Sequence, residues 1–353
     1  MKILIDINHP AHVHYFRNFI KLMEAKGHLF CVVNRNSKMI NQLLDYYGIE
    51  HTIRNKRPEK KGTIASLVYL LKMTMWCIRK SLLFHPDMYI GFASSACAIT
   101  SWLFRKPSIL IDDTEHNAMN HRIYLPLCSA VLTPFYFTKD LHKGSLGNRK
   151  QFRFNAFVEQ LYLHSSYYIK NRSILEELDI KPKEYVIVRY IAYDAHHDIV
   201  ARPLSEEVKK QIVRTISKYY RVFVSLEKDT NDAFYDNYLL KISPEKMHDL
   251  EAHAKFMVTE GATMASESFV HGVPYLYLNP LKCGYIDYQC HNYPDRCFQT
   301  TDKKKTMSII DVLARTNVDS ESAKREIEKR HIDPTLFLER FVENFPDSKN
   351  QDI

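Results

Sequence analysis

The sequence predicts an α/β protein in which two doubly wound parallel sheets each form a domain. Short apolar runs that do not alternate with polar residues are separated by segments of helical spacing, and this succession begins twice along the chain. The first start is the apolar run over residues 1–7, followed by helical spacing over 13–26 that ends at Gly27. Because strands buried on both faces lack alternation, this order is typical of parallel sheets covered by helices.

Each half of the chain contains several such units. In the first half, strands are expected over residues 28–33, 88–91 and 107–111, with helices over 38–47 and 64–83. The second half begins with YVIVRY at residues 185–190. Its further strands are expected over 221–226, 255–259 and 274–278, and its helices over 206–219, 244–254 and 263–271.

These patterns predict four parts of the chain. Residues 1–160 form an N-terminal domain, 161–183 a linker, 184–333 a C-terminal domain, and 334–353 a last helix that crosses back to the first domain. Open α/β sheets bind ligands at the carboxyl ends of their strands. Two such domains are therefore expected to face a shared cleft.

Composition excludes several protein classes. The 353 residues are 45% hydrophobic and 25% charged, which suits a globular protein with a large core. The 9 glycines form neither GxGxxG nor a P-loop, and HExxH, GxSxG and paired CxxC motifs are absent from the sequence. The common NAD-binding, P-loop, zinc-protease, serine-hydrolase and zinc-ribbon signatures are therefore missing.

Charge and cysteine usage favour a cytoplasmic protein. The seven cysteines are scattered, which fits reduced thiols, and the first ten residues contain no apolar signal-peptide core. A net charge of +8 is moderate for this length and does not indicate a nucleic-acid partner. The chain has no Asp-x-Asp, so no metal ion is expected, and no cofactor is expected apart from a substrate.

A basic segment over residues 54–61 precedes the apolar run 64–83. Three interpretations of the run stay open: a core helix packed on a sheet, a helix lying on an anionic membrane surface, and a membrane-spanning helix. Lys72 in the middle of the run argues against the spanning helix.

The segment TEGATMASESFVHGVP, residues 259–274, combines features of a phosphate site. Gly261 allows a tight turn after a strand, and Thr263 and Met264 open a helix whose free N–H groups suit a phosphate. Glu267 lies one turn into the helix, where a carboxylate could bind a ribose diol. The alternative is purely structural, with Thr263 as the N-cap and Glu267 favouring the first turn.

This run, G-A-T-M-A-x-E-x-x-x-x-G-V-P, resembles the donor-site signature of GT-B glycosyltransferases. It is similar to that of the N-acetylglucosaminyltransferase that makes lipid II and to that of UDP-N-acetylglucosamine 2-epimerase. DINHPAHVHYF at 6–16, IDDTEHN at 111–117 and RYIAYDAHHD at 189–198 look like an uncharacterised family of glycosyltransferase-like bacterial and archaeal proteins. The resemblance implies a GT-B fold of two Rossmann-like domains.

The resemblance also implies roles for residues of the second half. Glu267 would hold the ribose of a nucleotide sugar, and Arg189 would neutralise phosphate charge. Asp194 and His196 follow Arg189 as cleft contacts, with a structural role as the alternative. The turn that would hold the diphosphate consists of Gly261, Ala262, Thr263 and Met264.

Three histidines follow the first strand. Neutral histidine is the natural general base near pH 7. The resemblance places the base at His12, which lies fifteen residues before Gly27, and leaves His14 as a rival. Asn8 and His9 are then expected to shape the loop or contact the acceptor.

An acidic cluster, Asp112, Asp113 and Glu115, follows the strand expected over 107–111. The cluster is interpreted as orienting the base or binding acceptor hydroxyls, with Asp113 as a catalytic residue and Glu115 as a cleft contact. The alternative is that Asp113 and Thr114 cap the next helix.

The resulting hypothesis is a glycosyltransferase that moves a sugar from a nucleotide-diphosphate donor such as a UDP-sugar to a carbohydrate or lipid-linked acceptor in cell-surface glycan synthesis. In-line attack would invert the anomeric centre, and retention stays open because one fold hosts both outcomes. Residence at the inner face of the membrane is part of the hypothesis. The alternatives are a nucleotide-sugar epimerase or hydrolase of the same fold, and a non-catalytic membrane-associated scaffold.

Overall fold

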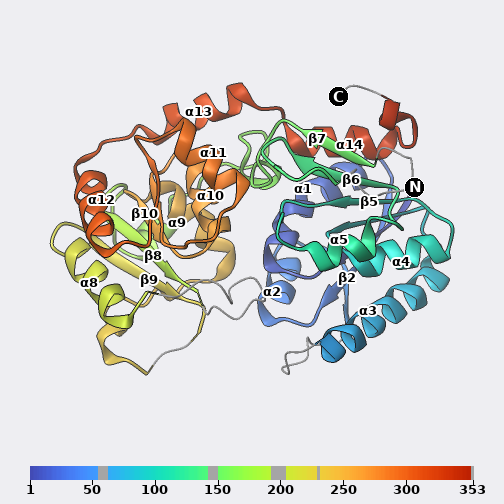
Figure 1. Ribbon diagram of the computed structural model, residues 1–353, viewed down its shortest axis with the longest axis horizontal. Helices are drawn as coiled ribbons and strands as arrows, with labels where there is room; N and C mark the ends of the chain where they lie inside the picture. The colour runs from blue at the N-terminus through green and yellow to red at the C-terminus, as the bar shows by residue number, and fades with distance from the viewer. Residues whose placement is uncertain (55–62, 142–149, 192–203, 229–230, 351–353) are drawn as a thin grey trace. The chain divides into compact units, whose positions relative to one another are not determined.

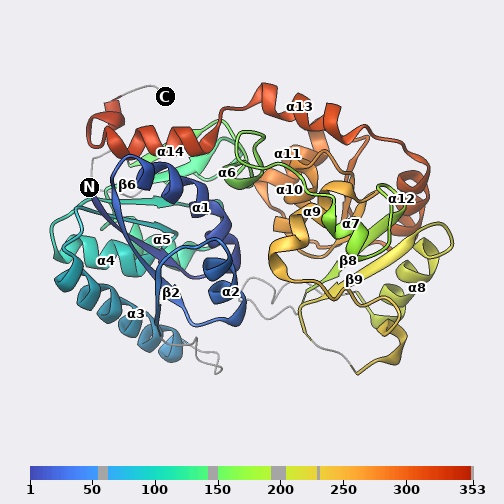
Figure 2. The same ribbon diagram turned by 180° about the vertical axis from the view of Figure 1, so that it is seen from behind.

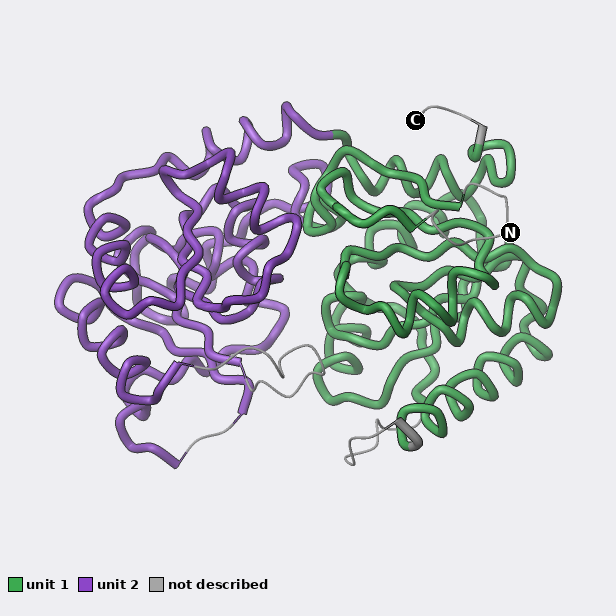
Figure 3. Tube along the Cα trace, viewed as in Figure 1, with its two compact units in different colours: residues 1–162, 332–353 green, residues 163–331 purple. Residues whose placement is uncertain are grey.

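The computed structural model describes residues 1–54, 63–141, 150–191, 204–228 and 231–350. The chain divides into two compact units, which Figure 3 distinguishes by colour. Unit 1 comprises residues 1–162 and 332–353, and unit 2 comprises 163–331. The segment 161–183, expected to be a linker, is split between the units at Tyr162.

Unit 1 contains a seven-stranded parallel sheet in the order β3-β2-β1-β4-β5-β6-β7 (Figure 1). Both β4 and β6 are buried along their whole length, as is typical of parallel strands covered by helices on both faces. The strands are β1 (Lys2–Ile7), β2 (Leu29–Arg35), β3 (His51–Arg54), β4 (Met88–Phe92), β5 (Ser108–Ile111), β6 (Ala130–Pro134) and β7 (Gln151–Phe154).

Helices connect these strands. The first begins where the His9 side chain accepts a hydrogen bond from the N–H of Ala11 and Pro10 occupies the first turn. It ends before Gly27, which has a φ of 83°. The helices are α1 (Pro10–Ala25), α2 (Lys38–Tyr46), α3 (Thr63–Phe84), α4 (Ser95–Leu103), α5 (Ala118–Tyr124), α6 (Gln160–Leu163) and α14 (Pro334–Glu343).

The last helix, α14, packs within unit 1, where Figure 2 shows it beside α1. Lys26 after α1 forms an ion pair with Glu343 over 2.8 Å. Phe341 lies against Phe152 of β7, with ring centroids 5.2 Å apart. The C-terminal segment is therefore part of the first structural unit despite its distance in sequence.

Unit 2 contains a five-stranded parallel sheet in the order β12-β11-β10-β8-β9. The strands are β8 (Tyr185–Tyr190), β9 (Arg221–Leu226), β10 (Met257–Thr259), β11 (Tyr275–Tyr277) and β12 (Cys297–Gln299). The helices are α7 (Ser173–Glu177), α8 (Glu206–Ile216), α9 (Met247–His253), α10 (Ala262–Val270), α11 (Gly284–Asn292), α12 (Lys303–Arg315) and α13 (Ser320–Arg330), with short 3-10 turns at Ala233–Tyr235, Pro244–Lys246 and, in unit 1, Asp347–Asn350.

The fold class expected from the sequence is confirmed, because both units are parallel sheets flanked by helices. Figure 1 shows helices on both faces of the unit 1 sheet. The sequence patterns missed several short elements, including β3, β6, β7 and β12. Each has only three to five residues, too few for a periodicity signal.

A glycine substitution tests how α10 ends. Gly272 has a φ of 72°, and a Cβ there would lie 2.2 Å from the carbonyl oxygen of Ser320. Gly48 has a φ of 67° with open space around it, so Gly48→Ala is a matched control. We expect Gly48→Ala to lower the free energy of unfolding by about 1 kcal/mol. Gly272→Ala should cost at least about 2 kcal/mol more because the backbone of α13 must shift. Equal losses in urea unfolding would contradict this expectation.

Candidate functional site

In unit 1, polar side chains gather where β1, β3 and β4 end. Asp6 is fully buried and accepts hydrogen bonds from Asn8 at 2.7 Å and Ser94 at 2.5 Å. Its other oxygen pairs with Arg54 over 2.6 Å, and Arg54 also donates to Asn8. This network fixes the loop after β1. Arg54 is only 2% exposed, so it does not belong to a basic surface as the interpretation of residues 54–61 required. Residues 55–61 lie outside the described residues.

His12 lies at this edge, in the first turn of α1. Its ring is 4.9 Å from that of Phe92 and 5.9 Å from that of His9. Desolvation, followed by the positive charges of His9, Arg35 and Arg54, lowers the pKa of His12 well below its usual value. His12 is therefore neutral at pH 7. Its Nδ1 accepts a long hydrogen bond of 3.4 Å from the N–H of Asn8, which assigns the ring proton to Nε2.

His14, the rival candidate, has different surroundings. It is buried between α1 and α2, where Nδ1 lies 3.3 Å from Arg17 and 3.4 Å from the Tyr47 hydroxyl. Its ring stacks on Tyr162 at 5.3 Å. These contacts give His14 a packing role within unit 1. Asn8 anchors the loop and His9 caps α1, so both shape the loop, which was one of their two expected roles.

The acidic cluster after β5 has three distinct environments. Asp112 is buried and accepts hydrogen bonds from His121 at 3.0 Å and from Tyr124. Glu115 accepts from the backbone and hydroxyl of Thr138 at 2.9 and 3.0 Å, so it fastens a loop. Asp113 is half-buried and accepts from the Thr114 hydroxyl at 2.9 Å. Neither Asp113 nor Thr114 caps α5, whose N-cap is Asn117.

Desolvation, followed by the negative charge of Asp112, raises the pKa of Asp113 to about 7. Asp113 can therefore both give and take a proton near neutrality. At the same edge, His12 has a lowered pKa and Asp113 a raised one. Neighbouring groups whose pKa values are shifted in opposite directions are suited to proton transfer.

In unit 2, α10 begins directly after β10. Its N-cap is Gly261, so the structural alternative of Thr263 as N-cap is wrong: Thr263 lies inside the helix. The hydroxyl of Thr259 accepts from the N–H of Gly261 at 2.9 Å. Within the described residues, the N–H groups of Ala262, Thr263 and Met264 donate no hydrogen bond.

Gly261 has an ordinary φ of −95°, so its backbone does not require glycine. A Cβ there would lie 3.5 Å from Ile191 and from Thr259, which is normal contact. The tight turn expected at this position is therefore not the reason for the glycine. Among the described residues, the missing side chain instead leaves no Cβ over the start of α10 on that side.

Arg189 lies between the neighbouring strands of the unit 2 sheet. Its Cα is in register with Thr259 of β10 and Ser225 of β9. The guanidinium donates to the Ser225 hydroxyl at 2.7 Å. Desolvation lowers its pKa from the usual value, opposed by the negative charges of Glu227, Glu251 and Glu267.

Glu267 is buried at 6% exposure and lies 3.2 Å from Nε2 of His248 on α9. One turn along α9, Glu251 is fully buried, and neither of its carboxylate oxygens accepts a hydrogen bond from a described residue. Burial and the charge of Glu267 raise the pKa of Glu251 well above its usual value. Sequence analysis missed His248 and Glu251, although their i, i+3 spacing places them on one face of α9.

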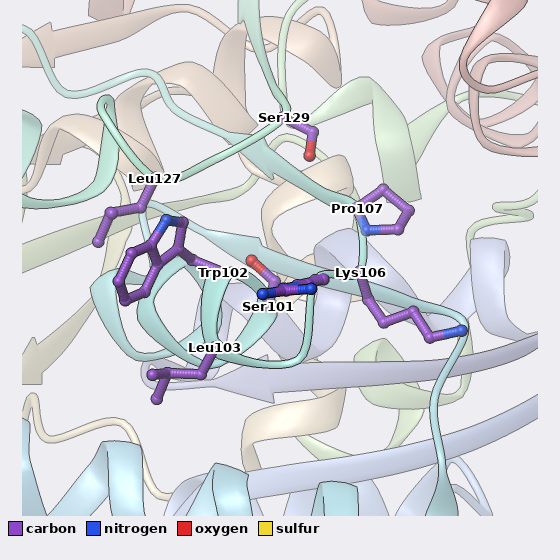
Figure 4. A pocket seen from close by; sticks show the side chains of 8 residues that line it. Ser101, Trp102, Leu103, Lys106, Pro107, Leu127 and Ser129 are labelled. Atoms are coloured by element: carbon purple, nitrogen blue, oxygen red, sulfur yellow. The ribbon is translucent and has the colours of Figure 1, made fainter.

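Two expected contacts, Asp194 and His196, lie outside the described residues. In the described part of the chain, no group of three or more His, Cys, Asp or Glu side chains is arranged to hold a metal ion. A pocket of about 580 Å³ lies at the carboxyl end of α4 (Figure 4). Pro107 and Ser129 in its lining directly precede β5 and β6, so the pocket is at the amino ends of the strands, away from His12 and Asp113.

A family model described as "Protein of unknown function (DUF354)" matches residues 1–345. The chain belongs to this family. The uncharacterized protein MJ0665 of Methanocaldococcus jannaschii is a curated relative of this chain. It is 23% identical over 330 residues, which cover 88% of this chain and 91% of the relative.

Solved structures similar to this DUF354 protein have the GT-B fold. A UDP-GlcNAc 2-epimerase from Neisseria meningitidis bound to UDP-GlcNAc has a TM-score of 0.66 at 11% identity, covering 98% of this chain and 100% of that one. The glycosyltransferase of kitacinnamycin has a TM-score of 0.61 at 12% identity, covering 97% and 98%. The GT-B fold implied by the sequence resemblance is confirmed.

The raised pKa of Asp113 predicts a pH-dependent stability. The folded state holds the proton up to about pH 7, whereas the unfolded chain releases it near about pH 4. The stability that this proton provides is complete below about pH 4 and is lost as the pH rises to about 7. Relative to wild type, Asp113→Asn should therefore gain melting temperature over that range. Melting curves whose difference does not change with pH would refute the shift.

Proposed function

We propose that this protein is an enzyme acting on a nucleotide-diphosphate sugar, with glycosyl transfer as its reaction. The observation that carries the proposal is the convergence of three features at one edge of the unit 2 sheet. These features are the start of α10, whose first N–H groups have no partner among the described residues, the guanidinium of Arg189, and the buried carboxylate of Glu267. Together they match the chemistry of a nucleoside diphosphate.

The diphosphate would bind at the start of α10. Three consecutive N–H groups, from Ala262 to Met264, and the positive end of the helix dipole favour an anion there. Arg189 adds a full positive charge from the neighbouring strand. In glycosyl transfer these groups would stabilise the departing diphosphate.

Glu267 would accept hydrogen bonds from the ribose hydroxyls. His248 orients its carboxylate over 3.2 Å, and burial strengthens hydrogen bonds to the charged oxygen. Glu251 is a supporting residue: as a protonated acid beside Glu267 it adds no second negative charge to the nucleotide site.

Unit 1 would supply the proton-transfer group. The oxygen of an acceptor hydroxyl attacks the anomeric carbon, the bond from that carbon to the diphosphate breaks, and the hydroxyl proton passes to neutral His12. The lone pair of His12 is on Nδ1, so the long 3.4 Å contact from Asn8 is exchanged for the acceptor hydroxyl. Asp113 then orients the base or the acceptor. In-line attack inverts the anomeric centre.

The acceptor class of this proposal is a carbohydrate or lipid-linked hydroxyl in cell-surface glycan synthesis at the inner face of the membrane. A second candidate is epimerisation, favoured by the proton-transfer pair His12 and Asp113. It is also favoured by similar structures such as the UDP-N-acetylglucosamine 2-epimerase from Rickettsia bellii, with a TM-score of 0.68 at 11% identity, covering 100% of this chain and 99% of that one. Incubation with a UDP-sugar and no acceptor, followed by NMR of the sugar, separates the two. Inversion at a ring carbon other than the anomeric carbon, in the absence of acceptor, indicates epimerisation.

A conservative change at Glu267 tests the nucleotide site. Glu267→Gln keeps the shape and an acceptor for His248 but removes the charge. Loss of a hydrogen bond to a charged group costs about 1.5 to 3 kcal/mol, so UDP affinity measured by calorimetry should fall at least about tenfold. Glu326→Gln on α13, where Glu326 pairs with Arg296, is the control and should bind normally. Equal affinity in both variants would contradict the assignment.

Two histidine variants test the base. Removing a general base typically lowers the rate by about 10²- to 10⁴-fold. His12→Ala should therefore lose most sugar transfer at unchanged UDP affinity, whereas His14→Ala should mainly lower the melting temperature because Arg17 and Tyr47 lose a partner. Full turnover of His12→Ala with loss in Asp113→Ala would identify Asp113 as the base.

A further inference from the structure

Helix α3 of unit 1 exposes a continuous apolar face. With 3.6 residues per turn, Leu67, Leu71, Met75 and Leu82 fall within an arc of about 80°. These side chains are between 55% and 68% exposed. Val68 at 44% and Leu83 at 71% widen the same side. We refer to these six residues as the α3 face.

The remaining side of α3 packs on unit 1. Thr74, Cys77 and Ser81 are buried, and the hydroxyl of Ser81 accepts from Tyr89 of β4 at 2.7 Å. The helix also packs along α4. The interpretation of the run as a core helix is therefore right for one side only, because the side chains of the α3 face are 44% to 71% exposed. In Figures 1 and 2, α3 lies at the outer edge of unit 1.

Charge around the α3 face has one sign. Within 63–84 there is no Asp or Glu, and the basic residues are Lys72, Arg79 and Lys80. Lys72 and Arg79 are exposed. By helical position they lie at about 140° and 120° from Leu67, along one edge of the stripe formed by Leu67, Leu71, Met75 and Leu82 and between Val68 and Leu83. Long basic side chains at the border of an apolar stripe can extend toward phosphate groups while their stems cover apolar surface.

The end of α4 adds to the exposed apolar surface of this part of unit 1. Trp102 is 60% exposed and Leu103 51%. Both project from the end of α4 in Figure 4, followed by the exposed Arg105 and Lys106. Tryptophan is enriched where a protein meets the membrane interface.

We propose that the α3 face docks on an anionic phospholipid surface, with α3 lying in the headgroup layer. An apolar stripe bordered by basic residues is complementary to such a surface. A second copy of the chain is a poorer match, because a two-fold contact would set the same basic residues against each other without an acidic partner on the helix. None of the described helices is long and apolar enough to cross a bilayer. This proposal goes beyond the nucleotide reaction and does not depend on it.

Flotation of the full-length chain with vesicles, in the absence of nucleotide, tests the proposal. Binding should be strong to phosphatidylcholine containing phosphatidylglycerol, weak to phosphatidylcholine alone, and reduced by salt. The double variant Leu71→Glu, Met75→Glu should lower binding at least about tenfold, because it places two charges in the apolar layer. Lys72→Glu with Arg79→Glu should do the same.

The matched control is Ile169→Glu in unit 2, where the isoleucine is 90% exposed; its vesicle binding should equal that of wild type. All variants should keep wild-type UDP affinity and melting temperature, which separates failure of docking from failure of the proposed reaction. Vesicle binding that does not depend on lipid charge, or that is unchanged in both double variants, would overturn the proposal. A dimer detected by light scattering and lost in Leu71→Glu, Met75→Glu would also overturn it, in favour of a second copy.

Discussion

All described strands in both sheets run parallel, and this constraint decides where polar chemistry can be located. Strands covered by helices on both faces have apolar side chains along their length, so charged groups collect where the strands end. In unit 1 the buried Asp6–Arg54 pair occupies that edge. In unit 2 the corresponding edge carries Arg189 and the start of α10. Each sheet therefore has one edge at which charged groups gather.

The two edges have different electrostatics. In unit 1, burial and positive neighbours lower the pKa of His12, while burial and the charge of Asp112 raise the pKa of Asp113 to about 7. Such an edge is suited to moving protons. In unit 2, Arg189 and open N–H groups lie beside Glu267, an arrangement suited to holding a diphosphate and a diol at once. Binding and proton transfer would thus be divided between the units.

The sequence predicted the fold well because apolar runs separated by amphipathic helices leave local patterns. It predicted the start of α10 for the same reason, since a strand, a glycine and a helix follow in order. His12 and His14 could have been distinguished by helix geometry. Residues i and i+2 of a helix are rotated by about 200° from each other around its axis, so only one of the two can face the loop. His248 and Glu251 could not be found, because their proximity to Glu267 depends on packing of α9 against α10.

The position of α3 links membrane docking to the proposed reaction. Because α3 joins the end of β3 to the beginning of β4, it runs antiparallel to the strands, and its first turn lies at the edge that carries His12. A bilayer that received the α3 face would therefore lie beside the proton-transfer edge of unit 1. An acceptor hydroxyl attached to a lipid is confined to that layer, where its local concentration is high. Docking of the α3 face, as proposed, would thus favour a lipid-linked acceptor over a soluble carbohydrate.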